Sequence, residues 1–210
     1  MPGTMSKADL VADLKATLHD AAKPFEADGD DSAFERFLAN ALPDLGIKRP
    51  LTRLGQVSLV AGEPRYALST ITDFSSYKTD QWGAERQLPK PWDPCYPGAR
   101  PRVYAVKEPT GWSLVFDPAP TALHIGVLGG TFKFWYFARH SIGVDAADTT
   151  VSEQDRGLLL LRAQVEAMRE LAIHQANKPV RMNDGISGMP RNSTPAALHT
   201  TLLQLFRETA

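Results

Sequence analysis

The most regular hydrophobic pattern in the chain runs from Ser152 to Asn177 and predicts one long amphipathic helix. Apolar side chains recur there at steps of three and four residues and form one face: Leu158, Leu161, Val165, Met168 and Ala172. A second apolar row widens that face, so we expect the helix to be covered on more than one side: Leu160, Ala163, Ala167 and Leu171. Ser152 with Asp155, or Thr150 with Glu153, is suited to capping the first turn.

Two shorter helices are predicted near the N-terminus. The first begins at Ser6, with Asp9 at the third position after it, and ends at Pro24. The second opens with a capping box made by Ser32 and Glu35. Its apolar residues fall at helical spacing and three breakers close it, which makes it short: Phe34, Phe37, Leu38 and Ala41, then Pro43, Gly46 and Pro50.

The C-terminal pattern predicts a last helix, capped by Thr194 and preceded by a loop from Lys178 to Pro195. The helix carries a stripe of large apolar residues: Leu198, Leu202, Leu205 and Phe206.

Between the helices the period changes to alternation, which indicates strands. One hairpin is predicted where Val57, Leu59, Tyr66 and Leu68 flank the turn 61–64. The remaining strands are predicted at 102–107, 112–116, 123–128 and 131–137. Gly129 and Gly130 separate the last two and suit a two-residue hairpin turn, because such turns need positive φ angles. The strand 131–137 is almost continuously aromatic, so we expect both of its faces to be covered.

Residues 70–101 form the least regular part of the chain. Five prolines lie among Trp82, Trp92 and Tyr96 and exclude a helix or a central strand: Pro89, Pro91, Pro94, Pro97 and Pro101. Such a composition fits a recognition motif or an ordered loop held to the surface by its rings. We favour the ordered loop.

The order of the elements predicts an α+β protein, because strands grouped between helices do not alternate with them. We expect two N-terminal helices in residues 1–50 and an inserted antiparallel β domain of about six strands in 51–148, with a proline-rich loop at 88–101. The long core helix and a C-terminal arm or helix follow in 149–210. The predicted fold is thus a helical core with an inserted β-sheet.

The composition changes this picture little. The net charge is −1, from 23 Lys and Arg against 24 Asp and Glu, which indicates no general affinity for nucleic acid or membranes. Cys95 is the single cysteine, so neither a disulfide framework nor a cysteine-based zinc site is expected. No apolar run has the length of a membrane span or a secretory signal, which favours synthesis and retention in a reducing cytoplasm.

Residue patterns with known chemistry are scarce. The five histidines, of which His140 and His174 merit inspection, lack metal-ligand spacing. The acidic run 26–31 does not have the spacing of a calcium loop, and Gly185–Gly188 lacks a residue of a nucleophile elbow. We therefore expect no catalytic residue, metal or cofactor, and a protein that is not an enzyme.

Three passages resemble the head–tail adaptor (connector) proteins of tailed bacteriophages, in particular those with a β-sheet insertion in a helical core. The first is Leu42-Pro43 with Gly55-Gln56 and the run from Glu63 to Leu68. The second is the run from Trp112 to Thr121, followed by the aromatic strand. The third is the run from Thr149 to Ser152 with Asp155 and the leucines 158–160. The resemblance covers residues 32–177 and leaves the first helix and the segment 88–101 unmatched.

The resemblance implies a structural virion protein at the neck, assembled in the bacterial cytoplasm. Its partners would be further copies of itself in a ring of twelve, the phage portal protein, and a tail or stopper protein. Double-stranded DNA would pass through the ring without sequence-specific binding, which a near-neutral chain permits. A ring also requires two different complementary faces on each subunit. No membrane is involved.

The implied contacts fall on the last two helices. By analogy with such adaptors, the C-terminal segment reaches the portal through Leu198, Leu202, Leu203, Leu205, Phe206 and Arg207, although a helix packed on its own subunit explains the same stripe. Contacts within the ring are assigned to Leu160, Arg162, Glu166 and Arg169 on the long helix.

Two alternatives remain from the sequence. One is an enzyme or small-ligand module with a site in the β domain, lined by Trp112, Trp135, Tyr136 and His140; a deep pocket with convergent polar groups would favour it. The other is a stopper or tail terminator protein, one position further down the neck.

Overall fold

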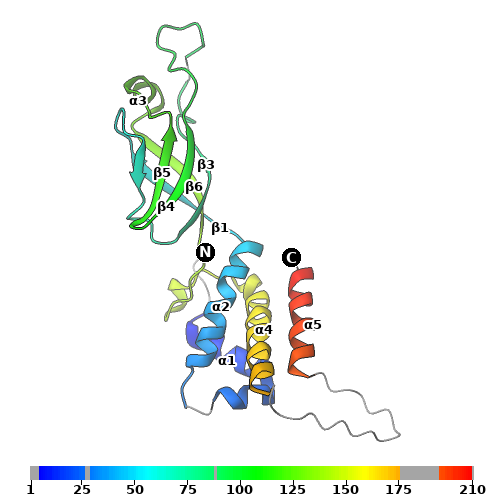
Figure 1. The fold of residues 1–210 in the computed structure, drawn as a ribbon. Coiled ribbons are helices and arrows are strands. Elements are labelled where there is room, and N and C mark those ends of the chain that lie inside the picture. The colour runs from blue at the N-terminus through cyan, green and yellow to red at the C-terminus, as the bar shows by residue number, and fades with distance from the viewer. Residues whose placement is uncertain (1–4, 27–28, 88, 176–193, 210) are drawn as a thin grey trace, which may run out of the picture. The chain divides into compact units, whose positions relative to one another are not determined.

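A computed structural model describes residues 5–26, 29–87, 89–175 and 194–209 (Figure 1). The class is α+β, as predicted: the described residues form five α-helices and six strands, and the strands make two three-stranded antiparallel sheets. The chain divides into two compact units. The helical unit comprises the described parts of residues 1–49 and 140–210, and the β unit those of residues 50–139.

The first helix of the helical unit, α1, spans Lys7–Leu18 and starts as predicted. Ser6 and Asp9 form a complete capping box, in which each side chain bonds to the backbone N–H of the other residue. The helix ends before Pro24, however, because a 3-10 helix takes over at His19–Phe25 and contains that proline. Proline is accommodated there because it already has the φ angle that the turn requires.

The second helix, α2, spans Ser32–Lys48, so the prediction of a short helix with a Ser32–Glu35 capping box was wrong. Asp31 occupies the cap position without a side-chain cap bond, and Ser32 instead donates from its N–H and hydroxyl to Asp30. Pro43 lies inside the helix on its exposed side. Water can therefore satisfy the carbonyl group that the proline leaves unpaired, and the apolar stripe continues to a buried Leu45.

The long helix begins with a 3-10 turn, Glu153–Asp155, and continues as α4 over Arg156–Gln175. Ser152 caps the turn by accepting from the N–H of Asp155 at 3.3 Å. Most residues of the two predicted apolar rows are buried, while Leu161 and Ala172 are partly exposed. The helices α1, α2 and α5 all contact α4, which confirms a helix covered on more than one side. The predicted end at Asn177 lies outside the described residues.

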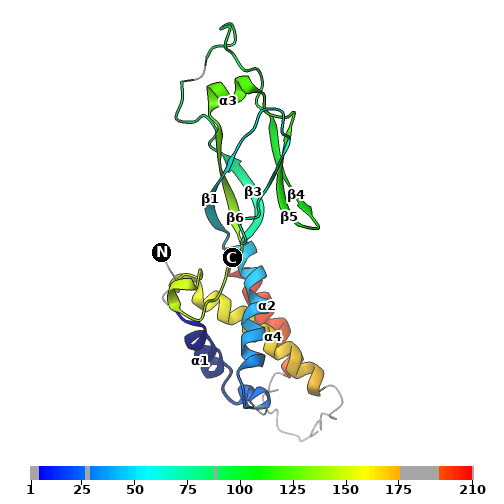
Figure 2. The same cartoon turned by 90° about the vertical axis from the view of Figure 1, so that its left-hand side faces the viewer.

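The last helix, α5, spans Pro195–Glu208 and is capped by the hydroxyl of Thr194, as predicted. Pro195, assigned from the sequence to a loop, is its first residue, where a missing N–H costs no hydrogen bond. The other residues of that predicted loop up to 193 lie outside the described part of the chain. Figure 2 shows α4 and α5 of the helical unit from a second direction.

A buried ionic cluster joins α2 to α4. The Nε of Arg162 donates to Asp44 at 2.5 Å, and its Nη1 lies 2.7 Å from Oε1 of Glu166. The second oxygen of Glu166 faces Arg169 at 2.6 Å, although the Glu166 residue is only 6% exposed. Burial opposes the charge on Arg162, but the bonds to the two carboxylates outweigh it and raise its pKa above the usual value.

The β unit contains two sheets with the strand orders β1-β6-β3 and β2-β5-β4. The aromatic strand β6 is central in the first sheet and β5 is central in the second. The strands predicted at 102–107 and 112–116 are confirmed as β4 and β5, which pair with each other in a register from Arg102↔Asp117 to Glu108↔Gly111. The strands are β1 Leu51–Ser58, β2 Arg65–Ala67, β3 Phe74–Asp80, β4 Arg102–Glu108, β5 Gly111–Asp117 and β6 Thr131–Ala138.

Both predicted hairpins were wrong. The runs around the turn 61–64 do not pair with each other, because β1 pairs with β6 and β2 with β5. The run 123–128 is a helix, α3 (Ala122–Leu128), which Thr121 and His124 cap. Gly129, with φ 104°, ends that helix instead of turning a hairpin.

One face of β6 is fully buried, not both as predicted. Phe132, Phe134 and Tyr136 point into the core, while Lys133 and Trp135 on the opposite face remain partly exposed. The buried rings pack edge-on against Phe116 and Trp82 from other elements. The Nε1–H of Trp82 also donates to the carbonyl of Gly129 at 2.8 Å, which joins the residues after β3 to the end of α3.

The strand β3 was missed in the segment predicted to be irregular. Its sequence, FSSYKTD, alternates only weakly, and two register shifts interrupt its pairing with β6. Because β3 is an edge strand, its pairing with β6 stabilises it, and the sequence around β3 alone does not reveal that pairing.

We expect Glu166→Gln to lower the free energy of unfolding by roughly 3 kcal/mol, because it removes one of the two carboxylates that compensate the buried Arg162 guanidinium. Urea denaturation followed by helical circular dichroism measures this. Arg169→Ala is the matched control: that side chain is 59% exposed, so we expect a loss below about 1 kcal/mol. Equal, small losses in both variants would contradict a buried ionic cluster.

Burial and a hydrogen bond to Asp73 raise the pKa of Tyr136 to about 12. The folded state holds this proton more tightly than the unfolded chain, whose tyrosine pKa is about 10. The resulting stability is complete below about pH 10 and is lost as the pH rises from there towards 12. Burial also raises the pKa of Tyr77, so ultraviolet titration of phenolate should show a late signal from both residues. Tyr136→Phe should reduce this late signal by one tyrosine, and Asp73→Asn should shift that part of it to lower pH. A late signal of unchanged amplitude in Tyr136→Phe would contradict the assignment.

Candidate functional site

The apolar stripe of α5 divides between the core of the helical unit and the solvent. Phe206 is 4% exposed and belongs to the core, and Leu202 packs against that core partly buried. Leu198 and Leu205 are 36% and 48% exposed. One side of the stripe therefore packs against the core of the helical unit, and two leucines on the other side are exposed to solvent.

The C-terminal end of α5 is fastened to α2 by Lys48. Its Nζ donates to the carbonyl oxygen of Arg207 at 2.7 Å and lies 5.5 Å from the centre of the Phe206 ring. Arg207 itself is exposed, and Leu203, the remaining predicted docking residue, is partly buried. This contact compensates carbonyl groups at the helix end with a positive charge.

The N-terminal half of α5 is packed less closely. A cavity of about 400 Å³ lies between α5, α4 and the 3-10 helix that follows α1. Its lining is mainly apolar and includes Leu198, Leu202 and Met168. The predicted docking face is thus continuous with an apolar hollow on the same unit.

The residues assigned to contacts between subunits of the ring lie on α4, but most of their side chains are buried in their own subunit. Leu160 and Glu166 are buried, and Arg162 is held between Asp44 and Glu166. Arg169 alone of the four is well exposed. A ring contact through these residues remains a prediction, and the exposed guanidinium of Arg169 is the group that it would use.

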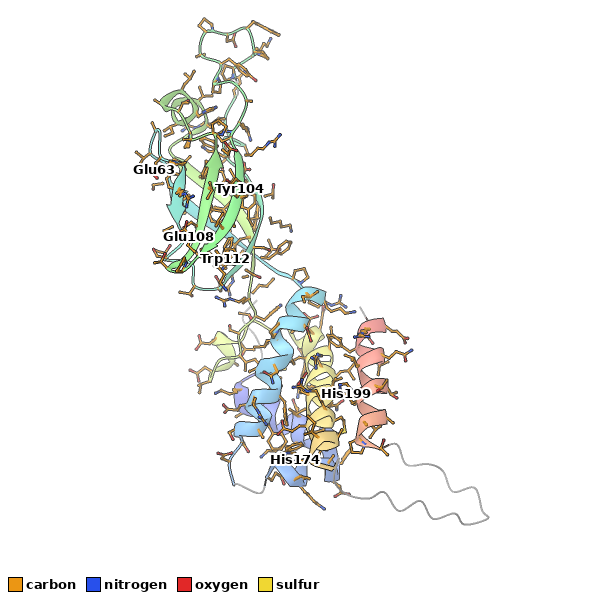
Figure 3. The ribbon with its side chains drawn as sticks, in the orientation of Figure 1. Glu63, Tyr104, Glu108, Trp112, His174 and His199 are labelled. Atoms are coloured by element: carbon orange, nitrogen blue, oxygen red, sulfur yellow. The ribbon has the colours of Figure 1, made fainter. Side chains whose placement is uncertain are left out.

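The four residues proposed to line a site in the β domain do not converge. Trp135 and Tyr136 are successive residues of β6 and point to opposite faces of the sheet. Trp112 packs against the Phe74 ring at 5.3 Å, and it is labelled on β5 in Figure 3. His140 belongs to the helical unit, where its Nε2 donates to the carbonyl of Arg49 at 2.8 Å.

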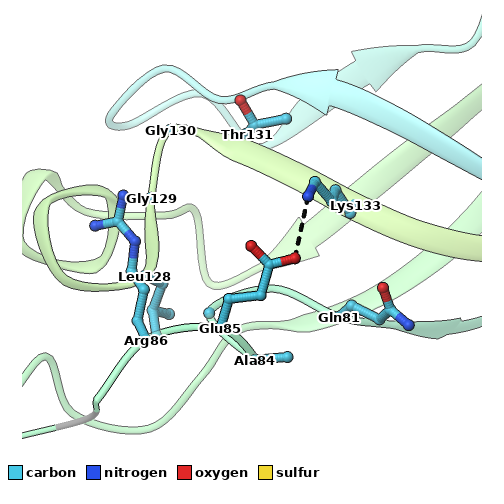
Figure 4. A pocket seen from close by; sticks show the side chains of 10 residues that line it. Gln81, Ala84, Glu85, Arg86, Leu128, Gly129, Gly130, Thr131 and Lys133 are labelled. Carbon is cyan, nitrogen blue, oxygen red and sulfur yellow. Dashed lines mark hydrogen bonds and ion pairs between the residues drawn. The ribbon is translucent and has the colours of Figure 1, made fainter.

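A polar cavity of about 350 Å³ lies at the end of the β unit where α3 meets β6 (Figure 4). Lys133 and Glu85 form an ion pair at 3.3 Å across it. Arg86 donates to the carbonyl groups of Gly126 and Val127 at the end of α3. Its charged groups are thus already compensated by one another or by the backbone, and no residue within reach pairs a nucleophile with a base.

The two histidines singled out from the sequence have structural surroundings. Besides its bond to Arg49, His140 approaches Thr150 with Nδ1 at 3.2 Å. His174 lies on α4, near its C-terminal end, 3.8 Å from Glu170 (Figure 3). Across the described ranges, no three His, Cys, Asp or Glu side chains are grouped as a metal site would need.

Sequence reasoning misplaced the aromatic residues of the segment 89–101. Trp82 is buried and holds the segment before it, but Trp92 is 76% exposed and Tyr96 38%, so these two rings do not fasten the loop to the surface. The sequence analysis favoured an ordered loop held to the surface by its rings over a recognition motif, and the exposure of these two rings contradicts the anchoring role.

Comparison with known proteins gives the chain no relative: no protein-family model matches it, and neither does any curated protein. Within the described residues, no helix has both the length and the apolar character needed to cross a membrane.

Proposed function

We propose that this protein is a ring-forming head–tail adaptor of a tailed bacteriophage, which joins the portal to the tail or stopper protein. It acts as a structural virion component, and DNA passes through the ring it forms. The proposal starts from the three passages that resemble such adaptors and rests on how the chain is divided.

The observation that carries the proposal is the division of the chain into two units. Helices on both sides of residues 50–139 pack into one unit around α4, although about ninety residues separate them in sequence. The intervening residues form the two sheets. This division supports a helical core with a β-sheet insertion, the organisation that the resemblance implies.

The surface of α5 supports a docking role for the C-terminal helix. Leu198 and Leu205 are seven residues apart, two turns along one side of α5, and both are exposed. Such a pair beside an apolar cavity suits the burial of a partner's apolar side chains, which is favourable in proportion to the area removed from water.

The charge distribution supports contacts between different faces of neighbouring copies. Residues 50–139 contain 10 Lys and Arg against 7 Asp and Glu, a net charge of +3, whereas the rest of the chain has 13 against 17, a net charge of −4. A ring is a closed series of contacts between two unlike surfaces of the same subunit. Opposite net charges on the two units favour such contacts over contacts between like surfaces.

The test is co-assembly with the portal protein encoded in the same genome. Native mass spectrometry and sedimentation of the mixture should show one portal ring carrying a ring of this chain, with twelve copies expected from the resemblance. Failure to associate with the portal under every assembly condition, with no ring formed by the chain alone, would refute the proposal.

A second prediction concerns the docking face. We expect the double variant Leu198→Glu, Leu205→Glu to lose portal binding while its urea unfolding stays within about 1 kcal/mol of the unsubstituted protein, because both side chains are largely outside the core. Phe206→Ala is the contrasting variant: it empties a buried site and should cost roughly 3 kcal/mol of stability. Portal binding that survives the double variant would remove α5 from the interface.

A further inference from the structure

The proline loop, residues 89–101, is an ordered surface projection of the β unit. Lys90 and Asp93 form a turn in which the N–H of Lys90 donates to the Asp93 carboxylate at 2.6 Å. The N–H of Tyr96 then donates to the carbonyl of Asp93, and the ring of His124 binds the carbonyl of Ala99. Prolines and these bonds hold the loop in shape, so little conformational entropy is lost when it binds a partner.

The projection lies far from the points where the chain enters and leaves the β unit. Leu51 pairs with Ala138 at one end of β1 and β6, and Ser58 pairs with Thr131 at the other. The loop meets that second end, next to Leu128 of α3, as Figure 1 also shows within this unit. Eight residues of strand, roughly 25 Å, therefore separate the projection from the junction.

The exposed side chains of the proline loop combine aromatic and positive character. Trp92 and Tyr96 are exposed, and Lys90 lies above the Trp92 ring at 5.4 Å. Arg100 of the same loop lies 3.9 Å from Asp80 at the end of β3 and keeps 44% of its side chain exposed. The one acidic residue of the loop, Asp93, is engaged by the backbone turn. Tryptophan, tyrosine and arginine are the residue types that dominate binding energy at protein interfaces. A partner for this surface must be acidic and offer an apolar contact.

A matching surface among the described residues of the helical unit is the acidic loop of residues 143–148. Val144 is 75% exposed, and Asp145 and Asp148 beside it form no ion pair with a described residue. The loop is held in place by bonds from the N–H of Lys7 to the Gly143 carbonyl and from the N–H of Gly143 to Thr149.

Two other exposed apolar residues of the helical unit, Ile47 and Ile173, have acidic neighbours that are already paired. The acidic residue near Ile47 is Asp44, which is paired with Arg162, and the one near Ile173 is Glu170, which is paired with Arg36. Of these three described sites, the acidic loop is the one that combines an exposed apolar side chain with two carboxylates that form no ion pair with a described residue.

We propose that the proline loop of one copy docks on the acidic loop of the neighbouring copy, with Trp92 against Val144 and with Lys90 and Arg100 facing Asp145 and Asp148. This inference rests on the proposed ring and names the two unlike faces that close it. The contact joins two unlike surfaces, one on each unit of the chain, and a ring is a closed series of such contacts.

Cys95 provides a direct test because it is the only cysteine and is exposed on the proline loop. The unsubstituted chain is mixed with a Cys95→Ser, Val144→Cys variant on the portal and oxidised. A disulfide-linked dimer of one chain of each kind is expected. Cys95→Ser, Ile173→Cys is the matched control, since Ile173 is exposed elsewhere on the same unit, and should give no dimer. Equal dimer yields, or none with Val144→Cys on an assembled ring, would overturn the proposal.

Charge exchange tests the same contact without cross-linking. Lys90→Glu with Arg100→Glu, and separately Asp145→Lys with Asp148→Lys, should each reduce ring occupancy on the portal, and combining all four should restore it. Trp92→Ala should weaken assembly at least tenfold without changing the unfolding transition. If the unsubstituted chain forms rings and all these variants do so equally, the contact is wrong while the adaptor function stands. If the unsubstituted chain never binds the portal, the adaptor function itself fails.

Discussion

The burial of α4 is the constraint on which the helical unit depends. Its two apolar rows are too wide for one neighbour to cover, so α1 and α2 from before the β unit and α5 from the end of the chain all pack against it. Glu166 on the same helix is buried only because Arg162 compensates it, and Arg162 in turn reaches Asp44 on α2. The apolar surface thus determines that the helices assemble, and the ionic cluster fixes how α2 and α4 are aligned.

The core of the β unit is built from packed aromatic side chains, whereas the core of the helical unit is built around α4. Phe132, Phe134 and Tyr136 project from the central strand β6, and rings from the second sheet and from Trp82 fill the space between them. Because this interior is occupied, functional chemistry in the β unit is confined to its surface. Two surface features of the described residues are the compensated pocket of Figure 4 and the projecting loop, whose Trp92 ring is 76% exposed.

Three helix caps were read correctly from neighbouring residues: Ser6 with Asp9, Ser152 with Asp155, and Thr194. The Ser32–Glu35 box was wrong although it is local, because Ser32 bonds to Asp30. Other errors came from a cap that was missed and from strand partners distant in sequence. The run 123–128 has strand-like residues but becomes a helix through its cap, and β1 and β2 pair with distant strands instead of with each other.

The candidate contact surfaces show the same limit. An apolar stripe on α5 predicts that the helix packs on something, but it does not tell which leucines face the protein's own core. Only the packing around Phe206 separates the inner residues from Leu198 and Leu205. Likewise, no sequence pattern predicts that Glu166 is buried or that Trp92 is exposed, because the exposure of each side chain depends on which other segments pack over it.

The β unit is inserted into the helical unit between Arg49 and His140. A hydrogen bond joins these two residues, so the chain leaves and re-enters the helical unit at neighbouring points. Any segment spliced between these residues therefore starts and finishes at nearly the same place, and its loop-closure entropy grows only slowly with its length. The helices impose little restriction on what is carried there. A longer, shorter or unrelated segment could therefore occupy this position while the helical scaffold keeps its own packing.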